Sequence, residues 1–201
     1  DIYIANDFDQ FNQLLINQQG QGFTEMAEQY GVKDPYDGMG LTTCDFNNDL
    51  SIDFFVTNIR ENSLFTKIPT NNSYDYTNYS EQANLYDTDW SWGVTFSDFN
   101  HDGYEDFYVA NGFFNPGNDR FLINDNGNNF TYGDFSGNPP LMSKSRSVNS
   151  FDYDNDGDLD LLVTDFNLNV NLWENKSVDT YFTDEVMGSW VKIFLQGTTS
   201  N

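Results

Sequence analysis

Short apolar runs, bounded by Asn or Asp, recur along the chain at nearly constant spacing. Four of them are rich in aromatic and β-branched residues and have the length of a β-strand: residues 1–6, 53–58, 106–111 and 160–165. The Asp residues that open them, Asp1, Asp53, Asp106 and Asp160, are 52, 53 and 54 residues apart. A constant period of this size indicates a repeat protein.

Three further strands are predicted in each repeat. The second lies at residues 14–17, 64–67, 121–124 and 172–175, the third at 23–24, 74–76, 130–131 and 182–183, and the fourth at 40–44, 92–96 and 147–151. Gly, Asn and Asp, which favour turns, fill the gaps. Four strands in a repeat of this length are typical of a β-propeller blade. We therefore predict an all-β chain of propeller blades, each with four antiparallel strands, in four repeats of about 53 residues.

A nine-residue acidic loop precedes each of the last three repeat-opening strands. Each loop has Asp or Asn at positions 1, 3 and 5 and Asp at position 9. With position 7 included, the candidate metal ligands are Asp45, Asn47, Asp49, Ser51 and Asp53, then Asp98, Asn100, Asp102, Tyr104 and Asp106, and finally Asp152, Asp154, Asp156, Asp158 and Asp160. Oxygen atoms at alternate positions of a tight turn converge on one point, and Ca²⁺ takes about six to eight of them. The sequence therefore predicts three calcium sites.

The EF-hand is the obvious alternative because its loop opens in the same way. An EF-hand needs a bidentate Glu at position 12 and a helix on each side. Position 12 is Val56, Val109 or Val163 here, and a strand-like run follows each loop. The same valines argue against dockerin-type and thrombospondin-type loops. The pattern therefore favours calcium loops within β-sheets.

The loops, with the strands that follow them, resemble the FG-GAP repeats of integrin α-like, VCBS-type β-propellers. The segments at 12–17, 22–24 and 38–41 and the ending at 189–201 are also similar to the UnbV/ASPIC group, which includes cartilage acidic protein. The resemblance implies an extracellular module for cell adhesion, surface or matrix assembly, or ligand binding. Residues 189–201 would then start a UnbV/ASPIC-like segment or form a closing strand.

The repeats divide residues 1–188 into 1–52, 53–105, 106–159 and 160–188. By alignment Asp1 occupies position 9 of a further loop whose first eight positions would precede it. Four blades could close into a small ring, or they could be consecutive blades of a larger one. Because a domain seldom begins inside its own metal site, we expect part of a larger propeller or assembly, in which other residues cover the end sheets.

The first loop departs from the other two at position 6. Leu50 stands where they have Gly103 and Gly157. This position usually has a positive φ angle, which a γ-branched residue adopts only at a cost. Position 3 is Asn in the first two loops and a carboxylate in the third. We therefore expect the first site to be the weakest and the third to be the tightest.

The amino-acid composition limits the classes of partner that the chain can bind. A net charge of −24 excludes nucleic acid, since phosphate binding needs basic patches, and it disfavours anionic membrane surfaces. No apolar run approaches the roughly 20 residues of a membrane span.

Cys44 is the only cysteine, so we expect a buried core residue. Extracellular or cell-surface placement is favoured because millimolar calcium suits loops without a bidentate Glu. Sequons at Asn71, Asn78, Asn129 and Asn175 make a glycoprotein possible.

Two classes of function remain. One is a non-catalytic module that binds a protein, a glycan or copies of itself. The alternative is the propeller domain of a carbohydrate-active enzyme such as a polysaccharide lyase, which needs a base and cationic groups near its substrate. The chain has eight Lys and Arg, spread singly, and one histidine, His101, inside a loop. We therefore expect a binding module with Ca²⁺ as its cofactor and without catalytic residues. Of Trp90 and Trp92, one could face a ligand.

Overall fold

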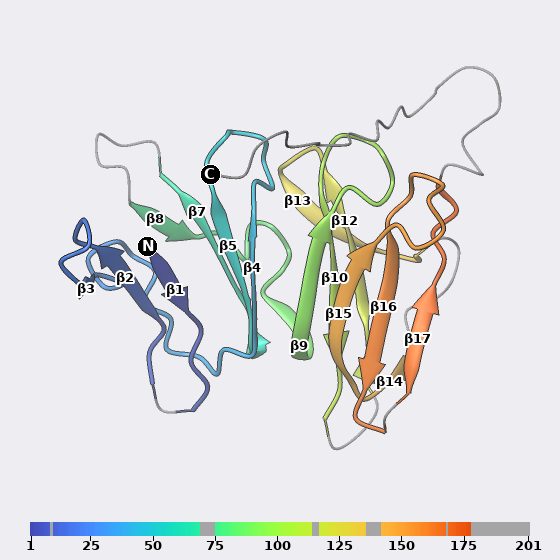
Figure 1. Ribbon diagram of the computed structural model, residues 1–201, viewed down its shortest axis with the longest axis horizontal. Coiled ribbons are helices and arrows are strands. Elements are labelled where there is room, and N and C mark those ends of the chain that lie inside the picture. The colour runs from blue at the N-terminus through green and yellow to red at the C-terminus, as the bar shows by residue number, and fades with distance from the viewer. Residues whose placement is uncertain (9, 69–74, 114–116, 136–141, 168, 178–201) are drawn as a thin grey trace, which may run out of the picture.

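The computed structural model describes residues 1–8, 10–68, 75–113, 117–135, 142–167 and 169–177. Their ordered elements are strands in antiparallel sheets, as the sequence predicts. The sheets stand side by side along the long axis of the molecule, from the N-terminal sheet at one end to the C-terminal sheet at the other (Figure 1). Among the described residues, no helix is long and apolar enough to cross a membrane.

Two sheets contain the full set of four strands that the repeat predicts. One has the order β4 (Gly40–Cys44), β5 (Asp53–Thr57), β7 (Ser63–Lys67) and β8 (Tyr76–Asn78). The other repeats this order in β9 (Asp87–Ser97), β10 (Asp106–Asn111), β12 (Arg120–Asp125) and β13 (Asn129–Gly133). A short strand that sequence analysis did not predict, β6 (Ile59–Glu61), pairs with the start of β9 and thereby links the two repeats.

The outer sheets have three described strands each. β1 (Ile2–Ile4), β2 (Gln13–Asn17) and β3 (Phe23–Glu25) form one, β15 (Ser145–Phe151), β16 (Asp160–Asp165) and β17 (Val170–Trp173) form the other, and β11 (Gly117–Asn118) pairs with β14 (Met142–Ser143). The strand predicted at 182–183 and the segment 189–201 lie outside the described residues. Within the described residues, the N-terminal sheet starts at β1, the counterpart of β5, β10 and β16, and has no counterpart of β4.

The strands that follow the loops are central in their sheets. This position explains why their sequences are apolar without alternation, because side chains on both faces are covered. All six residues of β10 are buried, and so are Phe55 and Val56 in β5. Full burial of an apolar side chain of this size contributes about 1.5–3 kcal/mol to the free energy of unfolding. These strands therefore supply much of the core.

Aromatic rings join neighbouring sheets. The ring centroids of Phe55 in β5 and Phe107 in β10 are 4.5 Å apart, and Tyr3 in β1 stacks on Phe54 at 5.1 Å. Such pairs add about 0.5–1.5 kcal/mol beyond the area that they bury. Cys44 is buried in the same core as Phe55 and Phe107, as predicted. The repeated aromatic residues therefore serve packing between sheets.

The strands that lead into the acidic loops, β4, β9 and β15, approach one another closely. A Cβ atom added to Gly40 would collide with the backbone oxygen of Trp92, and one added to Gly93 would lie 2.8 Å from the Cα of Ser147. Glycine at these two positions therefore allows β4, β9 and β15 to lie side by side. The loops that follow these strands are brought to one edge of the molecule.

Candidate metal-binding loops

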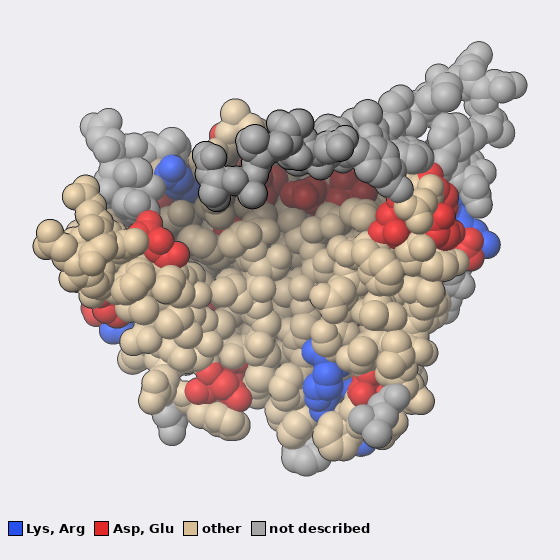
Figure 2. Space-filling model, in the orientation of Figure 1, with Lys and Arg blue, Asp and Glu red and all other residues tan. Residues whose placement is uncertain are grey.

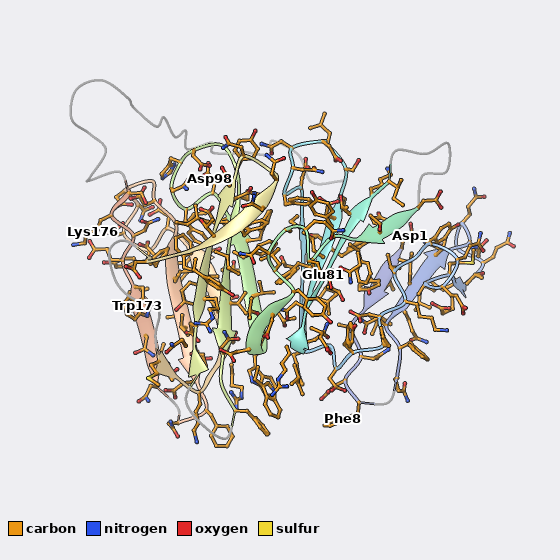
Figure 3. The ribbon with its side chains drawn as sticks, turned by 180° about the vertical axis from the view of Figure 1, so that it is seen from behind. Asp1, Phe8, Glu81, Asp98, Trp173 and Lys176 are labelled. Carbon is orange, nitrogen blue, oxygen red and sulfur yellow. The ribbon has the colours of Figure 1, made fainter. Side chains whose placement is uncertain are left out.

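The three acidic loops are the turns of β-hairpins. They connect β4 to β5, β9 to β10 and β15 to β16, each through an antiparallel pair. All three lie at the upper edge in Figure 1, and Asp98 marks this edge in Figure 3. Acidic side chains gather along the same edge in Figure 2. The repeat architecture therefore places the predicted ligands of all three loops on one side of the molecule.

The second loop is folded by hydrogen bonds to its own side-chain oxygens. The Asp98 carboxylate accepts the backbone N–H groups of Asp102 at 3.1 Å and Gly103 at 3.0 Å. Oδ1 of Asn100 accepts the same Asp102 N–H at 3.0 Å, and Oδ1 of Asp102 accepts the Tyr104 N–H at 2.8 Å. The first loop repeats all four bonds with Asp45, Asn47, Asp49, Leu50 and Ser51. Side-chain oxygens of positions 1, 3 and 5 are thus collected within one tight turn.

The third loop gathers three carboxylates. One oxygen atom each from Asp152, Asp154 and Asp156 lies within 4.8 Å of the other two. The Asp156 N–H donates to Asp154 Oδ1 at 3.3 Å, and the Asp158 N–H donates to Asp156 Oδ1 at 2.9 Å. Like charges at this separation repel one another, and a cation between them replaces repulsion by attraction.

Two positions in each loop have left-handed backbone conformations. At position 4 these are Asn48, His101 and Asn155, with φ angles of 55°, 60° and 66°. At position 6, Gly103 and Gly157 have φ angles of 90° and 101°, and Leu50 has 66°. The prediction that Leu50 must adopt a positive φ angle is therefore confirmed. Its side chain is 94% exposed, so no buried contact compensates for the backbone conformation.

Position 9 is held in the same way in every repeat, because one of its carboxylate oxygens accepts a backbone N–H from the end of the second strand. The pairs are Asp53 with Lys67 (3.2 Å), Asp106 with Asn124 (2.8 Å), Asp160 with Asn175 (2.8 Å) and Asp1 with Asn17 (2.8 Å). Asp53, Asp106 and Asp160 are fully buried. Asp1 makes the hydrogen bond of position 9, as its alignment predicts.

Several loop oxygens fit a bound cation. Oδ2 of Asp53, Oδ2 of Asp106 and Oδ1 of Asp152 are buried without a hydrogen bond of normal geometry in the part of the chain that the structure describes. Burial raises the pKa of Asp53 to about 6 and that of Asp106 to about 7, and the carboxylates of Asp102 and Asp98 also raise the latter. A buried carboxylate is costly to ionise unless a positive charge lies beside it. These atoms are the donors that a hard, oxygen-preferring cation requires.

At position 7 of each loop, the backbone N–H group donates a hydrogen bond within the loop. The N–H groups of Ser51, Tyr104 and Asp158 donate to the side chain at position 5 of their loops. The Asp158 side chain, a predicted ligand, is fully buried, and its Oδ1 lies 2.7 Å from Nε2 of His101 in the neighbouring loop. Sequence analysis missed this contact between loops, since the only signal for it is a histidine at position 4.

Two buried asparagines, which sequence analysis also missed, connect the first and second loops to the sheet that follows each of them. Nδ2 of Asn124 donates to the backbone oxygen of Phe46 at 2.8 Å, and Nδ2 of Asn175 donates to that of Phe99 at 2.9 Å. Phe46 and Phe99 both stand at position 2 of their loops. The available signal was the recurrence of Asn at the end of the second strand, at Asn17, Asn124 and Asn175.

The burial of Asn175 bears on the sequon at this position. Its side chain is 1% exposed and donates to the oxygens of both Phe99 and Leu159, so the amide is inaccessible in the folded chain. This burial disfavours glycosylation at Asn175 in the folded chain. Asn78 is exposed and Asn129 is half-buried, whereas Asn71 lies outside the described residues.

A family model described as an FG-GAP-like repeat matches residues 45–109 and again residues 98–163. Together the two matches span more than half of the chain and contain all three acidic loops. The chain therefore belongs to the FG-GAP-like repeat family. No curated protein matches the chain. The similarity of residues 189–201 to the UnbV/ASPIC group stays a prediction.

Proposed function

We propose that the chain is a calcium-binding, non-catalytic β-propeller module that contacts a ligand outside the cell. One observation carries the calcium assignment: loop carboxylates of Asp53, Asp106 and Asp152 have buried oxygens without a hydrogen bond among the described residues. Ca²⁺ takes about six to eight oxygen ligands in flexible geometry, whereas Mg²⁺ demands a near-ideal octahedron. Irregular loops that mix carboxylate, amide and backbone oxygens therefore suit Ca²⁺ better.

Side chains at positions 1, 3, 5 and 9 would hold the ion, and position 7 would contribute its backbone carbonyl, as in other loops of this spacing. When bound, the ion supplies a positive charge that compensates the carboxylates. The chain itself positions the ligands. Backbone N–H groups orient the ligand side chains before the ion arrives, as at Asp98 and Asn100. The ion would therefore rigidify hairpins that are already formed.

We further propose that the four-stranded sheets are propeller blades. The order β4-β5-β7-β8 recurs as β9-β10-β12-β13, and β4, β9 and β15 lie side by side, as the inner strands of blades do. Apolar side chains are exposed in the two outer sheets, including Ile2 (46%) and Phe23 (53%) at one end and Val170 (65%) and Leu172 (47%) at the other. Such faces favour further blades or an assembly that covers them.

A binding role suits the described residues better than catalysis. The single histidine of the chain, His101, contacts the buried Asp158, and both lie among the predicted calcium ligands. The partner would be a protein, a glycan or other copies of the chain. An extracellular setting agrees with loops that lack a bidentate Glu, since such sites work at about 10⁻⁴–10⁻³ M calcium.

One observation favours the second candidate, a carbohydrate-active propeller. The guanidinium of Arg146 lies 4.3 Å from the ring centroid of Trp92 and 5.5 Å from that of Phe166, whose side chain is 66% exposed. An acidic sugar could stack on the exposed ring and pair with the cation, although the guanidinium also donates to the backbone oxygens of Gly112, Lys144 and Ser145. Lyase and hydrolase assays of the full chain on acidic polysaccharides test this candidate, and we expect no turnover.

Isothermal titration calorimetry tests the calcium assignment directly. We expect the full chain to bind up to three Ca²⁺ ions and to bind Mg²⁺ much more weakly. Asp106→Asn should remove or weaken one site. The control is Asp89→Asn, which changes an exposed carboxylate paired with Arg120 outside the loops and should leave binding intact. Equal binding by both variants, or no calcium heat at all, would contradict the assignment.

A further inference from the structure

Side chains at position 4 reach from one loop to the next. Nδ2 of Asn48 in the first loop donates to the backbone oxygen of Gly103 in the second, at 2.9 Å. His101 in the second loop lies 2.7 Å from Asp158 in the third. The same position therefore links each loop to its successor, with a different residue pair each time.

The contact of His101 with Asp158 joins segments that carry candidate ligands in both loops. His101 stands between Asn100 and Asp102, and its backbone is in the left-handed conformation of the turn. Asp158 is fully buried, and its N–H donates to Oδ1 of Asp156. A shift of either loop would therefore leave a buried carboxylate without its imidazole partner, which is costly.

A second contact spans the same two loops. Asn175 donates its backbone N–H to Asp160, at position 9 of the third loop, and its side-chain N–H to Phe99, at position 2 of the second. Ser177 also donates to the Phe99 oxygen, at 2.7 Å. One short segment after β17 thus touches both loops. This segment therefore provides a second physical link between the two loops.

We propose that neighbouring loops bind calcium with positive cooperativity, and that His101 is the positioning residue that couples the second site to the third. This inference rests on the proposed calcium binding. An ion bound to one loop orders the residues that contact the next loop. Binding of the second ion therefore has a smaller conformational-entropy cost. Coupling of this kind changes affinity by about 5- to 150-fold, and it acts equally in both directions.

The test follows each loop separately in the full, ¹⁵N-labelled chain. Amide signals of Gly103 and Gly157 report calcium binding to the second and third loops during an NMR titration. Asp102→Ala disables the second loop. We expect this change to weaken calcium binding at Gly157 by at least about fivefold. If the third loop binds calcium with unchanged affinity, the sites are independent and the inference is wrong.

His101→Gly then tests the coupling residue. Glycine accepts the positive φ angle of position 4 and has no side chain to reach the third loop, whereas Asn at this position of the first loop contacts the next loop. In this variant, Asp102→Ala should no longer weaken calcium binding by the third loop. Asp158→Asn keeps an oxygen that can accept from His101 and should preserve coupling, whereas Asp158→Ala should abolish it.

The outcomes separate the two proposals. If calcium shifts both glycine signals but His101→Gly leaves the coupling intact, His101 is not the coupling residue, and calcium binding itself stands. If calcium shifts neither signal while the chain remains folded by circular dichroism, the proposed function fails and the inference fails with it.

Discussion

Leu50 allows the loop geometry to be tested by a single substitution. Its φ angle is 66° and its side chain is 94% exposed, so replacement removes almost no buried surface. A left-handed conformation costs a residue with a Cβ atom about 1–2 kcal/mol. Glycine removes this cost but adds about 0.5–1 kcal/mol of chain entropy in the unfolded state. Leu50→Gly should therefore raise the free energy of unfolding by about 0–1.5 kcal/mol, and it should strengthen calcium binding by the first loop.

The reverse change at the same position of the second loop is the matched test. A Cβ atom on Gly103 would meet nothing within 4 Å, and the φ angle there is 90°. Gly103→Leu should therefore act through backbone conformation alone, lowering both stability and the affinity of the second loop. Gly20→Leu is the control, because Gly20 also has a positive φ angle and open space but lies outside the loops. Urea unfolding and calcium titration measure both effects. Destabilisation by Leu50→Gly, or stabilisation by Gly103→Leu, would refute the reasoning.

Three further predictions concern ligand charge, the contacts between repeats and pH. Asp156→Ala should lower the thermal stability of the calcium-loaded chain more than Asp49→Ala, and equal losses would contradict the ranking of the sites. Asn124→Ala should cost about 2–4 kcal/mol in urea unfolding because it leaves buried oxygens of two segments without a donor, whereas Asn128→Ala on the exposed turn should cost little. Burial raises the pKa of Asp119 from 3.8 to about 6, so the native state holds a proton that the unfolded state releases. The contribution of Asp119 to the unfolding free energy should therefore fall as pH rises from about 4 to 6. In saturating calcium, Asp119→Asn should make the pH slope over this range more positive than that of the unchanged chain, and equal slopes would exclude this contribution.

The fold class and the loops could be predicted from sequence because both depend on short-range patterns. A strand following a loop is covered on both faces, so its apolar run stands out, as in β10. Loop ligands need fixed spacing, so Asp98, Asn100, Asp102 and Asp106 are visible in one nine-residue window. Hydrogen bonds within that window then set the geometry without help from distant residues.

Contacts between repeats could not be predicted, because they depend on how the sheets pack. Asp158 was expected among the ligands of its own loop, since it stands beside Asp156 in sequence. The backbone N–H of Asp158 donates to Asp156, and packing brings His101 of the neighbouring loop to its side chain. The burial of Asn175 has the same origin, because its partner Phe99 is 76 residues away.

Thermal unfolding of the full chain with calcium and with excess EDTA tests the central claim most directly. A site at 100 times its dissociation constant adds about 2.7 kcal/mol, and 1 kcal/mol shifts the melting temperature of a chain of this size by about 2–4 °C. Each saturated loop should therefore raise the melting temperature by about 5–10 °C, and EDTA should remove the whole increase. Mg²⁺ at the same concentration should restore little of it. Identical melting curves in calcium and in EDTA would contradict the account.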